Sequence, residues 1–134
     1  MLYNISTGFG VPYCPSADIV FLVSSLYKLR ELGVQFIFTD RHAYLVAARF
    51  FDDLNSLDQI DWDILQSRDF KRDTKDPGKL DRYMAEALAY REVPVSGLLG
   101  LVCYNVQVEE ELKKALANRG IELPTIVRPG WYFR

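Results

Sequence analysis

Short apolar runs rich in branched side chains constrain the fold of this chain most. One run covers residues 18–23 and another covers residues 98–104, and residues 34–38 also read as a strand. A continuous apolar run of this length is typical of a strand that is covered on both faces. Together with a last short strand expected at residues 124–127, these runs predict a β-sheet.

Helical patterns lie between the runs. A serine pair at residues 24–25 can cap a short helix, and Gly33 is a typical residue for ending it. A later helix is predicted over residues 108–116, with Gly120 marking its end. Acidic and basic side chains four residues apart, such as Glu109 and Lys113, support this helix.

A further helix is predicted after residue 42, where apolar residues recur at helical spacing and Thr39 or Asp40 can cap the first turn. Its apolar stripe should pack on the sheet and fill the core, while the neighbouring residues 52–53 should tolerate substitution. The stripe consists of Ala43, Val46, Ala47, Phe50, Phe51 and Leu54.

Strands and helices alternate without a regular repeat, which predicts an α/β fold of the mixed α+β kind. With 134 residues, 49% of them hydrophobic, the chain fits one domain over residues 1–134. The formal net charge of -2 gives no overall attraction to polyanions, so any nucleic-acid contact needs a local basic patch. No apolar run is long enough to span a bilayer, and we expect a cytoplasmic protein without a membrane partner.

Few residues in the sequence fit a metal or redox site. Cys14 and Cys103 have no CxxC spacing, and His42 is the only histidine, so chemistry that needs two imidazoles is excluded and no metal is expected. Residues 8–10 read Gly-Phe-Gly but lack the third glycine of a dinucleotide fingerprint, which favours a plain loop.

Residues 58–79 are polar and contain a strong turn, Asp76-Pro77-Gly78, which predicts a surface excursion. The basic side chains of residues 68–82 are interspersed with aspartates, so their attraction to phosphate should be modest. Trp62 and Trp131 could stack on bases, although core packing is the more common role of such residues.

Glu86 lies where a half-buried strand or short helix would normally carry an apolar residue. A carboxylate in such a place has either a function or a partner. One interpretation is catalytic, because a carboxylate can stabilise positive charge on a ribose. The other is a surface acid that pairs with Arg82 or Arg91.

Several segments of the chain carry a family resemblance together, in one order: residues 36–43, 50–54, 57–62, 82–88, 93–95 and 127–133. They resemble the DarT family of toxin enzymes, which transfer ADP-ribose from NAD to a base of single-stranded DNA. The resemblance implies an ADP-ribosyltransferase-like fold, with NAD as co-substrate and with single-stranded DNA and a macrodomain antitoxin as partners. The acceptor base would be thymine or guanine.

The resemblance also implies roles for individual residues. Glu86 corresponds to the catalytic glutamate, which orients the ribose and helps the acceptor base to lose its proton. Basic residues that could contact the acceptor base or phosphate tend to lie just before this glutamate in the family, and either Lys79 or Arg82 matches them, the other reading being a solvated charge. His42 follows a predicted strand, in a loop position that commonly presents functional side chains, and it could contact the acceptor nucleotide or serve a structural role.

Residues 1–3, Met-Leu-Tyr, resemble a stretch from the middle of the family's chain. The segment before that stretch contributes most of the family's NAD-binding residues, so we expect this N-terminal part to be missing and the 134-residue chain alone to bind NAD weakly or not at all. The alternative to an enzyme is a truncated, inactive remnant that binds a protein or nucleic acid without turnover.

Overall fold

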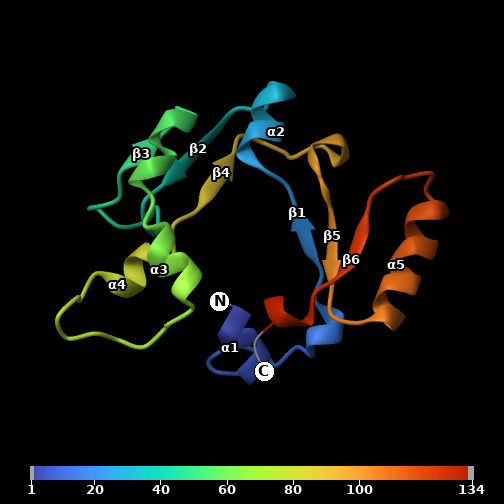
Figure 1. The fold of residues 1–134 in the computed structure, drawn as a ribbon, viewed down its shortest axis with the longest axis horizontal. Coiled ribbons are helices and arrows are strands. Elements are labelled where there is room, and N and C mark those ends of the chain that lie inside the picture. Colours follow the sequence, from blue (N-terminus) through green and yellow to red (C-terminus); the bar gives the residue numbers. More distant parts are fainter. Residues whose placement is uncertain (1, 133–134) are drawn as a thin grey trace. The chain divides into compact units, whose positions relative to one another are not determined.

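The computed structural model describes residues 2–132 and separates the chain into two compact units. One unit comprises Met1–Ser25 and Pro94–Arg134, and the other comprises Leu26–Val93. Each unit contains a three-stranded sheet and short helices (Figure 1), so the predicted mixed α+β class is confirmed. No helix within residues 2–132 is long and apolar enough to cross a bilayer.

The first unit is built on strands β1 (Phe21–Val23), β5 (Gly100–Cys103) and β6 (Thr125–Val127), in the order β1-β5-β6. β5 pairs antiparallel with β1 and parallel with β6. The connection from β5 to β6 contains α5 (Val106–Ala117), which packs against β6 (Figure 1). The unit also contains α1 (Leu2–Thr7) and the 3-10 helices η1 (Ser16–Asp18), η3 (Val95–Gly97) and η4 (Pro129–Trp131).

Two local features hold this sheet together. A Cβ atom on Gly100 would lie 2.9 Å from the Pro124 carbonyl oxygen, so only glycine allows this close approach of backbones at the start of β5. The buried Tyr132 hydroxyl lies 2.9 Å from the Ile19 carbonyl oxygen and 3.1 Å from that of Val102, and it donates to these groups. Burial raises the pKa of Tyr132 to about 12.

The second unit is built on β2 (Phe36–Thr39), β3 (Phe50–Phe51) and β4 (Ala87–Ala89), in the order β3-β2-β4 with both pairs antiparallel. Its helices are α2 (Leu26–Glu31), the 3-10 helix η2 (Leu54–Gln59), α3 (Trp62–Ser67) and α4 (Lys79–Arg82). The core is formed by buried apolar side chains of the helices and strands, with Phe51, Leu54 and other half-buried residues packed around them. The buried members are Leu29, Phe36, Phe38 and Ile60.

The expected strands and two expected helices are confirmed. α2 ends before Gly33, which has a φ of +72°, and α5 is capped by Asn105, whose side chain accepts a hydrogen bond from Val108 N at 2.9 Å. The Glu109–Lys113 ion pair is present at 3.0 Å. The first strand is shorter than expected, and Leu22 within it is exposed, so the prediction of a strand covered on both faces is wrong.

The helix predicted after residue 42 is absent. Residues 42–48 form turns, and Phe50 and Phe51 form β3, which pairs with β2. The apolar spacing is misleading because Tyr44 and Val46 are exposed, and Phe50 is 54% exposed. Only Phe51 and Leu54 pack against the core as expected. The physical reason lies at Asp40, whose carboxylate binds arginines instead of capping a first helical turn.

Candidate active site

The backbone of Glu86 is fixed by the second sheet. Glu86 comes directly before β4, and Thr39 N donates to Glu86 O at 2.9 Å, which extends the ladder between β2 and β4. Glu86 N in turn donates to the hydroxyl of Thr39 at 3.3 Å. Thr39 is only 1% exposed, so the strand end that carries Glu86 is held from within the unit.

The side chain of Glu86 points to the segment between β2 and β3, which we call the 40–49 loop (residues 40–49). Glu86 Oε1 accepts a hydrogen bond from Ala43 N at 2.8 Å and lies 3.3 Å from His42 Nδ1. The carboxylate is 36% exposed, and no hydrogen bond to Oε2 is found among residues 2–132. One oxygen is therefore oriented by the protein while the other is available to a ligand.

The structure does not support a pairing of Glu86 with Arg82 or Arg91. Arg82 forms ion pairs with Asp61 and Asp76, and the guanidinium of Arg91 lies over the Tyr90 ring. Glu86 Oε1 instead accepts its hydrogen bond from the amide of Ala43, and His42 Nδ1 lies 3.3 Å from the same oxygen. A simple surface ion pair does not explain this carboxylate.

His42 and Glu86 are the predicted site residues that the structure brings together. The His42 amide donates to Asp81 O at 3.3 Å, which links the 40–49 loop to α4. Its imidazole is about half exposed, and Nδ1 also accepts a hydrogen bond from Tyr44 N at 3.2 Å. The ring is therefore oriented on one side by the protein and accessible on the other.

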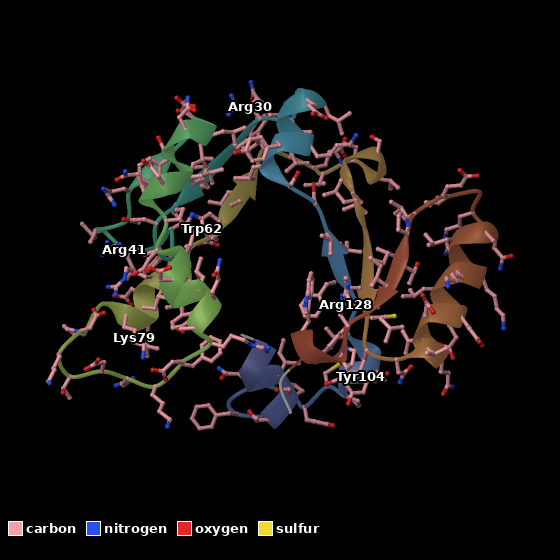
Figure 2. The ribbon with its side chains drawn as sticks, viewed as in Figure 1. Arg30, Arg41, Trp62, Lys79, Tyr104 and Arg128 are labelled. Carbon is pink, nitrogen blue, oxygen red and sulfur yellow. The ribbon has the colours of Figure 1, made fainter. Side chains whose placement is uncertain are left out.

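Lys79 and Arg82 are held by acids other than Glu86. The buried Lys79 ammonium lies 2.6 Å from Asp69, and this hydrogen bond raises the pKa of Lys79 and lowers that of Asp69. Arg82 Nε lies 2.9 Å from Asp61, while its two terminal nitrogens bind Asp76. Both cations therefore hold residues 61–79 in place through ion pairs. Arg41, Trp62 and Lys79, which are labelled in Figure 2, belong to the same unit.

An apolar cavity of about 230 Å³ adjoins the carboxylate. Glu86 is the only charged residue of its lining. The other lining residues come from α2, β2, η2, α3, the start of β4, Ile60 and Ala85. Trp62 contributes an indole that donates to Leu57 O at 2.7 Å and is 47% exposed, so the expectation of a core tryptophan is wrong. A fixed aromatic surface beside a carboxylate suits a planar, partly apolar group.

Asp40 is a buried acid of the 40–49 loop, 3% exposed directly after β2. Its burial alone would raise the pKa, but hydrogen bonds from Arg41 and Arg49 outweigh burial and lower the pKa to about 2. No group of three or more potential metal ligands is found among the described residues. The chemistry available here is that of carboxylate, imidazole and backbone amide.

The depressed pKa of Asp40 predicts a loss of stability in acid. Its folded pKa of about 2 lies below the ordinary value of 3.8, so its contribution is present above pH 4 and is lost as the pH falls towards 2. The contribution is on the order of 2 kcal/mol. In urea unfolding, the difference between wild type and Asp40→Asn should shrink over this pH range. A constant difference would contradict the assignment.

Sequence reasoning missed three parts of the site. Thr39 and Asp40 were assigned as helix caps, although both are buried and serve the 40–49 loop. The Ala43 amide carries no side-chain signal at all, and only the fold reveals that it meets Glu86. The aromatic surface of Trp62 was expected in the core. The one sequence feature that pointed to this part of the site was the polar pair Thr39 and Asp40, which directly follows a predicted strand.

Comparison with known proteins gives a consistent result. Residues 1–133 match the family model described as "ssDNA thymidine ADP-ribosyltransferase, DarT". A DNA ADP-ribosyl transferase of Escherichia coli O127:H6 is 46% identical over 99% of this chain, and this chain spans 62% of that relative. A DNA ADP-ribosyl transferase of Thermus sp. strain 2.9 is 34% identical over 99% of this chain and 63% of its own length.

Solved structures agree with this match. The structure of Thermus sp. 2.9 DarT in complex with NAD+ superposes with a TM-score of 0.89 at 30% identity, covering 98% of this chain and 66% of that chain. The same protein in complex with ADP-ribosylated single-stranded DNA gives a TM-score of 0.88 at 31% identity, covering 98% and 63%. The resemblance seen in the sequence and the expected fold are confirmed, and the chain belongs to the DarT family.

Proposed function

We propose that this chain carries the catalytic carboxylate of an NAD-dependent DNA ADP-ribosyltransferase, and that Glu86 is that carboxylate. The observation that carries the proposal is the geometry of Glu86, with Oε1 held at 2.8 Å by Ala43 N beside an apolar cavity of about 230 Å³. Support comes from Thermus sp. 2.9 DarT, which has been solved with NAD+ and with ADP-ribosylated single-stranded DNA.

The reaction breaks the bond between nicotinamide and ribose, and nicotinamide leaves with the bonding electron pair. Positive charge then develops on the ribose, and a preorganised carboxylate stabilises it most when it is fixed before the reaction. Glu86 Oε2 accepts a hydrogen bond from a ribose hydroxyl while Oε1 remains on the Ala43 amide. A ring nitrogen of the base forms the new bond to the ribose carbon, and its proton passes to Glu86.

We propose thymine in single-stranded DNA as the acceptor, with guanine as the alternative. The family description names thymidine, and the reacting edge of a base is hidden by pairing in a duplex. His42 is our candidate for contact with the acceptor base, because its half-exposed ring lies 3.3 Å from Glu86.

The basic segment before α4 is proposed to contact phosphates. Lys79 and Arg82 neutralise Asp69 and Asp76 within the fold, so they contribute to substrate binding by shaping this segment. Its exposed cations then face fewer free acids than the sequence indicates, and they can attract phosphate. These cations are Lys71, Arg72 and Lys75.

Tyr44 is a second candidate for contact with DNA. It is 91% exposed on the 40–49 loop, and its ring lies 6.5 Å from that of His42. Stacking of a base on an aromatic ring contributes about 1–3 kcal/mol. We expect Tyr44→Ala to weaken binding of a fluorescent single-stranded oligonucleotide about 10-fold in anisotropy titrations. Tyr27→Ala, which removes an exposed tyrosine from α2, is the control, and equal affinities for both variants would contradict this role.

The partner and the compartment are proposed from the family resemblance: a macrodomain antitoxin that removes the ADP-ribose, and the cytoplasm. The function itself is tested with the extended chain, meaning this chain joined to the upstream segment of the Escherichia coli relative. We expect radiolabel from NAD on a thymine-containing single strand and none on its duplex. DNA binding without any labelling would favour the inactive binding domain instead.

A further inference from the structure

Asp40 is a buried acid that is not part of the lining of the cavity beside Glu86. Its carboxylate accepts hydrogen bonds from Arg41 Nε and Nη2, each at 3.2 Å, and from Arg49 N and Nε at 3.0 and 2.9 Å. A carboxylate this well satisfied is held firmly, because every bond it accepts involves a charged donor or a backbone amide. All four of these bonds come from residues of the 40–49 loop. Arg41 of this loop is labelled in Figure 2.

These bonds close the loop at its two ends. Asp40 is the first residue of the loop and Arg49 is the last, so the pair fixes both ends at once. Arg49 also reaches Gln59 Oε1 at 3.3 Å, and its guanidinium lies 5.5 Å from the centre of the Phe51 ring. The closed loop is therefore anchored to η2 and to a side chain that packs on the core.

The interior of the loop depends on this closure. Its turns are made by Leu45 N donating to His42 O at 3.0 Å and by Ala48 N donating to Leu45 O at 2.9 Å. Turn bonds in a surface loop with few buried apolar contacts open at low free-energy cost, and fixed ends oppose this opening. The middle of the loop presents Ala43 N to Glu86 at 2.8 Å, and the Ala43 side chain has no polar group to hold it there.

We propose that Asp40 is the positioning residue of this site: by tying Arg49 and Arg41 together, it holds the Ala43 amide on Glu86 Oε1. The proposal rests on the proposed function for the role of Glu86 in transfer, whereas the positioning is measurable without turnover. Thr39 assists, since its hydroxyl donates to Arg41 O at 2.6 Å and accepts from Glu86 N. The Thr39 hydroxyl thus contacts both the 40–49 loop and the backbone of Glu86.

A purely structural role for Asp40 makes a different prediction. If Asp40 only stabilised the unit, its replacement would speed amide exchange throughout the sheet through global unfolding. If Asp40 positions the loop, its replacement speeds amide exchange in the 40–49 loop more than in the sheet. Two amides separate these cases: Ala43 N, which donates to Glu86, and Tyr90 N, which donates to Gln35 O at 2.8 Å at the other end of the sheet.

The test is amide hydrogen exchange measured by NMR on the 134-residue chain at neutral pH. Asn keeps the shape of Asp40 but removes the charge that both guanidinium groups face. We expect Asp40→Asn to speed exchange at Ala43 about 10-fold or more relative to Tyr90. Asp63→Asn, an exposed acid of α3, should leave this ratio unchanged. An unchanged ratio in Asp40→Asn, or equal acceleration at both amides, overturns the proposal.

A double-mutant cycle and an activity measurement complete the test. Arg49→Met should speed exchange at Ala43, and adding Asp40→Asn should then have little further effect, because both changes open the same closure. In the extended chain, Asp40→Asn should lower kcat about 10-fold or more with little change in KM for DNA. Unchanged kcat in an active enzyme overturns the positioning role. Absence of labelling by wild type overturns the proposed function alone, because the exchange ratio is still measured.

Discussion

Glu86→Ala is expected to abolish ADP-ribosylation of single-stranded oligonucleotides by the extended chain, with a loss of about 100- to 1000-fold or more. The loss follows because Glu86 is the only charged residue that lines the cavity, and its oriented carboxylate is the group able to face a positively charged ribose. The measurement is the initial rate of transfer of radiolabel from NAD to DNA.

The fold should survive this change. Glu86 is 36% exposed, and the sheet holds its residue through backbone atoms that alanine retains. We expect unfolding free energies within about 1 kcal/mol of wild type. Glu92→Ala is the matched control, because Glu92 is an exposed glutamate outside the cavity lining. Transfer by the Glu86 variant at the rate of this control would return Glu86 to the role of a surface acid.

The largest stability effect is expected at Phe38. Its side chain is 2% exposed, belongs to the core of the second unit, and stacks on Phe51 with ring centres 5.5 Å apart. Truncation of a buried phenylalanine to alanine costs roughly 3–5 kcal/mol. Phe38→Ala should therefore lower the free energy of unfolding in urea by about this amount.

Phe50→Ala is the matched comparison, because the sequence placed Phe50 in the core and the structure leaves it 54% exposed in β3. A partly exposed ring has less apolar contact to lose, so we expect a cost of about 1 kcal/mol. Equal destabilisation by the two variants would show that the assigned face of the sheet is wrong.

The contrast between buried Phe38 and exposed Phe50 shows which parts of the fold the sequence could predict. Residues 34–38 and 98–104 were predicted as strands because their mostly apolar composition is a local signal. The stripe from Ala43 to Leu54 failed because its spacing also fits an exposed loop followed by a short strand. The choice between them depends on Asp40 binding Arg49, a contact that periodicity does not contain.

The same limit applies to the site. Glu86 was predicted as the catalytic carboxylate because a carboxylate next to an apolar strand is unusual and residues of the family motif surround it, and its catalytic role stays a prediction. The hydrogen-bond donor to Glu86, the backbone amide of Ala43, could not be predicted, because the sequence pattern of side chains does not show which distant backbone amide a carboxylate will meet. Lys79 and Arg82 were predicted to contact the acceptor nucleotide, but their acidic partners lie in loops at separations that helical spacing rules do not cover.

Mass spectrometry of a thymine-containing single strand, after reaction with the extended chain and NAD, tests the central claim most directly. The comparison is wild type against Glu86→Gln, because glutamine keeps the shape and can still accept the Ala43 amide but lacks the charge. We predict one ADP-ribose on thymine with wild type and none with Glu86→Gln in the same time. Equal modification by both proteins would contradict the claim that the Glu86 carboxylate carries the transfer.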